Sequence, residues 1–151
     1  MASTPIEFSG EELFQASADR VYALLTDLDA MSQTIPDLVS SERAGDRMLK
    51  CVVRPGFSFL RGTMKLQIEL ADLAPPDRAV MQVAAQGIGV SMRIISQLQV
   101  APEGSGARLT WSAQVDQLKG LVAALSPSLI KAAADQVIRH AWTQVRKQLG
   151  E

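Results

Sequence analysis

The residue types that carry most enzyme chemistry are scarce in this sequence, which has a single histidine, His140. One histidine excludes a two-histidine iron or zinc site, and one cysteine excludes a Cys/His zinc cluster, so no metal and no other cofactor is expected. His140 falls beside the apolar face of a predicted helix, about 60° from Val137, where it could reach a cavity as an acid or a base. The default interpretation is a core or rim histidine with a hydrogen-bonded partner.

Nucleophilic chemistry has no recognisable motif. No serine stands in a G-x-S-x-G context, Cys51 has no base near it in the sequence, and residues 87–89 (GIG) indicate a turn rather than a phosphate loop. Asp27 and Asp29 lie two positions apart and do not share a helix face, so helix capping or solvent exposure is expected for them. No catalytic residue is therefore assigned, and His140 is the one candidate.

The predicted interior surfaces combine flexible and small side chains, namely Met64, Met81 and Met92 with Ala85, Ala113, Ala133 and Ala141. Small residues leave room, and methionines adapt to irregular shapes, so these types suit an apolar ligand. Ser96 and Gln136 interrupt the apolar surfaces and would orient such a ligand, unless they are satisfied internally. The same residues can also fill a tight core, and the residue types alone leave that choice open.

Composition limits the class of protein. The chain has 151 residues, 47% of them hydrophobic, and its 15 basic side chains nearly cancel the 16 acidic ones. The length suits one domain over residues 1–151, and the balanced charge makes nucleic acid an unexpected partner. A lone cysteine, no signal-peptide pattern in residues 1–17 and no run of ~18 apolar residues predict a cytoplasmic protein without a transmembrane segment. The oligomeric state stays open.

The elements that would position these side chains can be read from hydrophobic periodicity. A strand within residues 5–16 precedes a helix that Ser17 caps, with an apolar face of Val21, Leu24, Leu25 and Leu28, and Pro36 ends the helical stretch. Six strands with period-two alternation follow, separated by turns at residues 44–47, 54–56, 74–78, 86–89 and 102–106. In one of them Met64, Leu66, Ile68 and Leu70 face the opposite way from Lys65, Gln67 and Glu69.

From Gly120 the pattern is helical to the C-terminus, and the proline of Ser126-Pro127 either kinks the helix or begins its main segment. Its apolar face comprises Ile130, Ala133, Ala134, Val137, Ala141 and Val145. Trp142 is predicted on the polar face beside Arg146, where it would pack under another element or meet a partner. A long helix with one apolar stripe and a sheet with one apolar face cover each other. We therefore predict an α+β helix-grip fold of order β-α-α-β6-α, a curved antiparallel sheet of about seven strands around the C-terminal helix.

Four stretches resemble the CoxG family, which is named for a component of carbon monoxide dehydrogenase and lies within the START-like (polyketide cyclase and lipid transport) superfamily. They are FSGEELFQASADRVYALLTD, the Ile35-Pro36 pair, RGTMKLQIELADLAPPDRAVMQV and KGLVAALSPSLIKAAADQVIRHAW. Their order and spacing agree over most of the chain. Two departures are Asp37, where the family usually has glycine, and a turn at residues 86–89 that is less rich in glycine.

The resemblance implies a gap between sheet and long helix, and hence a ligand-binding wall of Met64, Met81, Met92, Ser96, Trp111, Ala133, Gln136, Val137, His140 and Ala141. Phe57, Phe59 and Leu60 would form a lid or entrance, or continue the buried strands. The first hypothesis is a carrier or accessory protein for a lipid-like or quinone-like molecule, with a molybdenum hydroxylase-type redox enzyme as partner. The alternatives are a small cyclase or hydratase that uses His140, and a pure protein-interaction module.

Overall fold

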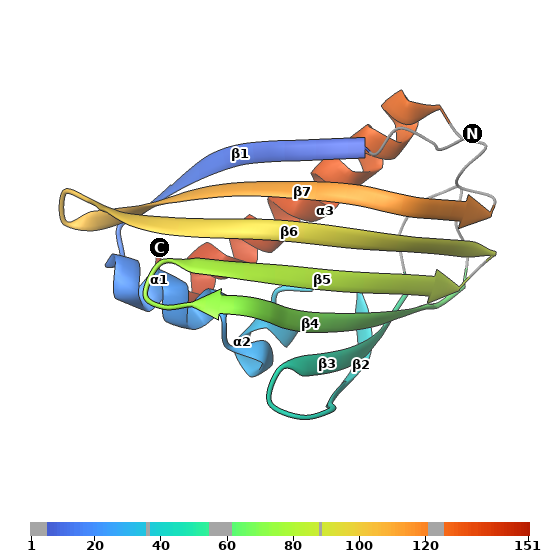
Figure 1. Cartoon of the computed structure of the whole chain (residues 1–151), viewed down its shortest axis with the longest axis horizontal. Coiled ribbons are helices and arrows are strands. Elements are labelled where there is room, and N and C mark those ends of the chain that lie inside the picture. The colour runs from blue at the N-terminus through green and yellow to red at the C-terminus, as the bar shows by residue number, and fades with distance from the viewer. Residues whose placement is uncertain (1–5, 36, 55–61, 88, 121–125) are drawn as a thin grey trace.

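The computed structural model describes residues 6–35, 37–54, 62–87, 89–120 and 126–151. β1 (Ile6–Phe14) leads into α1 (Ala18–Leu25) and α2 (Leu28–Ser32). Six strands follow: β2 (Leu38–Arg43), β3 (Met48–Val53), β4 (Met64–Ala74), β5 (Arg78–Gly87), β6 (Val90–Glu103) and β7 (Gly106–Gly120). The long helix α3 (Pro127–Gln148) comes last and runs behind the sheet in the view of Figure 1. The predicted helix-grip order is confirmed.

The strands form one antiparallel sheet in the order β1-β7-β6-β5-β4-β3-β2. β2 to β7 are a meander, and β1 closes the other edge by pairing with β7, with Ile6 opposite Val115 and Phe14 opposite Ala107. The alternation predicted for β4 is observed, since Met64, Ile68 and Leu70 are buried while the residues between them are largely exposed. Register shifts near Asp72 (φ 44°) and near Gln117 (φ 52°) are bulges, which bend and twist strands and so curve the sheet.

The first two helices begin at polar caps. The Ser17 side chain accepts a hydrogen bond from Arg20 N, as predicted. Asp27 accepts from the backbone N–H groups of Asp29 and Ala30 at 3.0 and 3.2 Å, which starts a second helix. Leu28 therefore belongs to α2 and not to the face of α1, because α1 ends at Leu25 and the chain is capped again two residues later.

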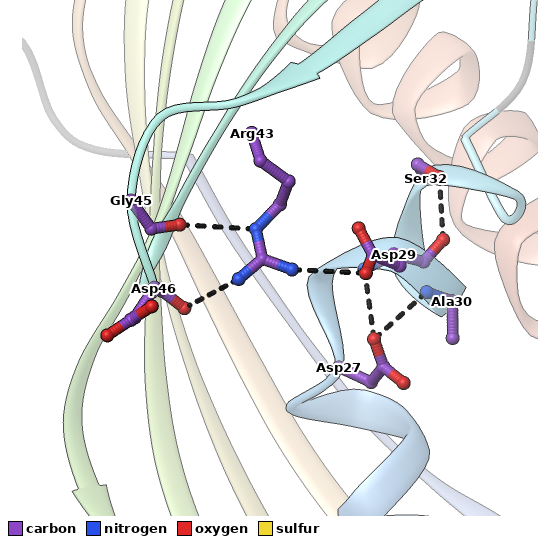
Figure 2. A network of polar contacts seen from close by, with 7 residues as sticks. All are labelled: Asp27, Asp29, Ala30, Ser32, Arg43, Gly45 and Asp46. Carbon is purple, nitrogen blue, oxygen red and sulfur yellow. Dashed lines mark hydrogen bonds and ion pairs between the residues drawn. The ribbon is translucent and has the colours of Figure 1, made fainter.

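A polar network fixes α2 against the β2–β3 turn (Figure 2). The Arg43 guanidinium donates hydrogen bonds to the carbonyl oxygens of Gly45 and Asp46, and it forms an ion pair with Asp29 at 3.2 Å. From the other side, the Gln148 amide of α3 donates to Ala30 O at 2.9 Å. The short helix is thus held between the edge of the sheet and the end of α3.

Asp37 occupies a special backbone position. Its φ is 59°, in the left-handed region that glycine adopts freely and that aspartate and asparagine tolerate better than other residues. The Asp37 carbonyl also accepts a hydrogen bond from Arg54 N at 2.9 Å, which ties the start of β2 to the end of β3. The glycine-to-aspartate departure therefore keeps the backbone geometry that a glycine would allow.

α3 is attached to the rest of the fold mainly at its C-terminal end. Ser126 caps the helix through Leu129 N, so Pro127 begins the helix and does not kink it. Val145 is the one buried residue of α3, and with Leu149 it joins a core cluster that includes Phe14 and Leu109. None of the helices among the described residues is long and apolar enough to cross a membrane.

The uneven attachment of α3 predicts unequal sensitivity to a buried charge. Val145 is 4% exposed, whereas Val137 keeps 37% of its surface accessible. Val145→Asp should therefore lower the free energy of unfolding by several kcal/mol, because the carboxylate has neither water nor a partner. Val137→Asp should cost clearly less, since water can reach the carboxylate. Guanidinium denaturation followed by circular dichroism measures both, and equal losses would contradict the attachment described above.

Candidate ligand-binding cavity

A cavity of about 430 Å³ lies between α3 and the inner face of the sheet. Side chains of β1, β5, β6, β7 and all three helices contribute to its wall, and none of those described is charged. The lining residues are Phe8, Leu24, Leu25, Met31, Thr34, Met81, Val83, Met92, Ile94, Ser96, Leu98, Trp111, Ala113, Val115, Leu118, Ile130, Ala133, Ala134, Val137, Ile138, Ala141, Trp142 and Val145. The wall is therefore almost wholly apolar and suits a hydrophobic molecule.

The cavity exists because α3 presents short side chains where the sheet is concave. Ala133, Ala134 and Ala141 line the helix side, and Ala113 lines the sheet side. Methyl groups cannot span the distance between a curved sheet and a helix that is buried at only one end. Met81 and Met92 project from the neighbouring strands β5 and β6 and can change rotamer to fit an occupant.

Phe14, Trp111 and Trp142 form an aromatic cluster near the C-terminus of α3, and the two tryptophans line the cavity. The Trp142 ring lies 6.4 Å from Phe14 in an edge-to-face arrangement and 6.0 Å from Trp111. Gly10 faces Trp111 across β1 and β7, and a Cβ at Gly10 would lie 3.1 Å from the indole. An isolated glycine inside a strand pattern signals such a close approach, so Gly10 marks the place where Trp111 packs against β1.

Trp142 does not lie on the polar face, and of the two alternatives predicted for it the packing under another element is observed. Ile138 and Val145 lie about one helical turn before and after Trp142, and both line the cavity. The buried face of α3 is therefore rotated toward Trp142 relative to the predicted apolar face. The same rotation explains His140 and Gln136, which are exposed and do not line the cavity. Each precedes a lining residue by one position, which is about 100° around the helix.

The other predicted wall residues are distributed as follows. Met81, Met92, Ser96, Trp111, Ala133, Val137 and Ala141 line the cavity. Met64 is buried beside it, in a cluster with Val53, Ala85 and Val90. The predicted lid of Phe57, Phe59 and Leu60 lies outside the described residues. Sequence reasoning missed Phe8 and Met31 in the opening strand and helices and Ile138 in α3, all of them apolar, and it missed Thr34, whose polar type gives no sign of burial.

Two titratable side chains near the cavity, Cys51 and Tyr22, have raised pKa values. Burial raises the pKa of the Cys51 thiol, which is 2% exposed in the cluster beneath α2, so the thiolate is disfavoured. Burial and the nearby Asp77 carboxylate raise the pKa of Tyr22, whose hydroxyl donates to Arg78 O at 2.8 Å. Neither residue lines the cavity. The site therefore offers an apolar container and, within its described wall, no activated nucleophile.

The sequence matches the CoxG family of carbon monoxide dehydrogenase components over residues 10–150. The chain belongs to this family. Its fold is similar to that of a conserved protein from Geobacillus kaustophilus, at 20% identity over 95% of each chain with a TM-score of 0.88. It also resembles a START superfamily protein from Mycobacterium smegmatis, at 15% identity over 94% of this chain and 95% of the other, with a TM-score of 0.70. No curated protein matches the sequence.

The void between α3 and the sheet can be tested by substitution. Ala141 lines the cavity, whereas Ala79 is 2% exposed in a close-packed cluster. Ala141→Leu should leave the melting temperature unchanged or raise it, because the added methyl groups enter free space. Ala79→Leu should cost ~1–3 kcal/mol through overpacking. Differential scanning calorimetry distinguishes the two, and similar losses would mean that the interior is filled near Ala141.

Proposed function

We propose that this CoxG-family chain is a carrier or accessory protein that holds a small hydrophobic molecule, lipid-like or quinone-like, between the sheet and α3. The observation that carries the proposal is a cavity of about 430 Å³ whose described wall has no charged side chain. Water in such a wall finds few hydrogen-bond partners, whereas an apolar ligand gains about 25 cal/mol for each Å² it removes from water. The wall favours occupancy by an apolar molecule over occupancy by water.

The proposed partner is a molybdenum hydroxylase-type redox enzyme. Membership of a family named for a component of carbon monoxide dehydrogenase supports this part of the proposal. Neighbouring genes provide its simplest test, since a molybdenum hydroxylase operon next to this gene is expected, and a neighbourhood of polyketide genes would oppose it.

The alternative functions lack a supporting observation. An enzyme that uses His140 would need the imidazole in the cavity wall, yet His140 is exposed outside it. An interaction module that docks through Trp142 would need that ring on the surface, yet it packs against Phe14 and Trp111. The carrier role requires an apolar cavity without a catalytic group, and the described wall has these properties.

The carrier proposal predicts an apolar molecule bound to the purified protein, detectable by native mass spectrometry and by solvent extraction. Two adjacent alanines give a matched pair, because Ala133 lines the cavity and Ala132 is exposed. Ala133→Phe should lose the bound molecule, since its ring occupies the ligand volume, and Ala132→Phe should retain it. If wild type carries nothing and also takes up no apolar probe such as N-phenyl-1-naphthylamine, the carrier proposal is wrong.

A further inference from the structure

The polar atoms of the cavity wall restrict the chemistry of the occupant. Four described lining residues carry a side-chain nitrogen or oxygen, namely Thr34, Ser96, Trp111 and Trp142. Thr34 is 7% exposed, and its hydroxyl already donates to Met31 O at 2.8 Å. The Thr34 proton is therefore engaged within the protein, and its buried oxygen could offer an occupant only an acceptor.

The two indoles are also closed to an occupant in this arrangement. Trp111 Nε1 and Trp142 Nε1 are buried and have no hydrogen-bond partner among the described residues. Trp111 Nε1 lies against β1, since a Cβ on Gly10 would be 3.2 Å from it. Because protein atoms cover both nitrogens, a molecule in the cavity meets the rings and not the N–H groups.

Ser96 remains. It lies on β6 between Met81 of β5 and Ala113 of β7, and all three residues line the cavity. Ser96 is half-buried and lines the cavity, and within the described part of the chain its hydroxyl makes no hydrogen bond, which leaves the oxygen available to an occupant. A hydroxyl both donates and accepts, so an alcohol or a carbonyl oxygen can pair with it.

We propose that the occupant is an uncharged molecule with a hydroxyl or carbonyl oxygen that hydrogen-bonds to Ser96, and that the rest of the molecule is apolar. This inference rests on the proposed carrier function and adds the ligand class. An ionised carboxylate or phosphate inside the cavity would meet no cationic side chain in the described wall, and an unpaired charge is costly to bury. Ser96 sets the orientation, while the flexible Met81 beside it adapts to the shape of the apolar part.

The test uses biphenyl, the isomers of hydroxybiphenyl and biphenyl carboxylate as size-matched probes, with dissociation constants from isothermal titration calorimetry at neutral pH. Ser96→Ala removes the open hydroxyl, and Ser112→Ala is the control, because Ser112 is an exposed serine on the neighbouring strand. Ser96→Ala should weaken at least one hydroxybiphenyl about fivefold, the value of one ordinary neutral hydrogen bond, and leave biphenyl unchanged. Ser112→Ala should change neither, and biphenyl carboxylate should bind wild type more weakly than biphenyl does.

Two results would overturn the inference while leaving the carrier function intact. In the first, biphenyl binds, but Ser96→Ala affects biphenyl and every hydroxybiphenyl alike. In the second, biphenyl carboxylate binds as tightly as the neutral probes and ignores Ser96→Ala, which would place the polar group of the ligand outside the cavity. If no probe binds wild type at all, the carrier function fails and the ligand class fails with it.

Discussion

The attachment of the C-terminal end of α3 to β1 is the interaction on which the rest of the structure depends. Arg146 lies over the Phe14 ring at 4.9 Å and forms an ion pair with Glu12 at 3.2 Å. The Glu151 carboxylate accepts hydrogen bonds from the backbone N–H groups of Gln15 and Ala16. Charge, a cation–π contact and buried apolar surface thus act together at one end of the helix. This end fixes the direction in which α3 crosses the sheet.

A helix fixed at one end and lined with alanines leaves space over a concave sheet. The wall of that space forfeits dispersion contacts, which a close-packed interior would make. The fold tolerates the loss because three separate clusters of buried residues surround the cavity, at the α3 attachment, beneath α2, and where Ile130 meets the opposite end of the sheet. Some wall residues, such as Leu98 and Val145, belong to these clusters, whereas Ala133 and Ala141 do not, so substitutions at the two alanines should affect folding less.

Most of the architecture could be predicted because its signals are local. Period-two alternation in β4 and the Ser17 cap each depend on a few neighbouring residues, whereas the sequence left open whether Pro127 kinks α3 or begins it. The failures concern packing between distant segments. The position of Trp142 depends on how far α3 rotates as it meets Phe14 and Trp111, and a helical wheel contains no information on that rotation. His140 does not line the cavity for the same reason, because its predicted position also depended on that rotation.

The cavity wall was predicted more accurately on the sheet than on the helix, and geometry explains the difference. In a strand the side-chain direction alternates strictly, so a residue such as Ser96 is assigned to a face once the strand is recognised. On a helix the side chains are distributed around a circle, and residues at the margin of the apolar face change sides with a small rotation. For that reason the strand residue Ser96 provides the firmer basis for recognition chemistry. The Ser96 backbone is held by strands on both sides, whereas the contacts of the flexible Met81 beside it can adjust to an occupant by rotamer changes.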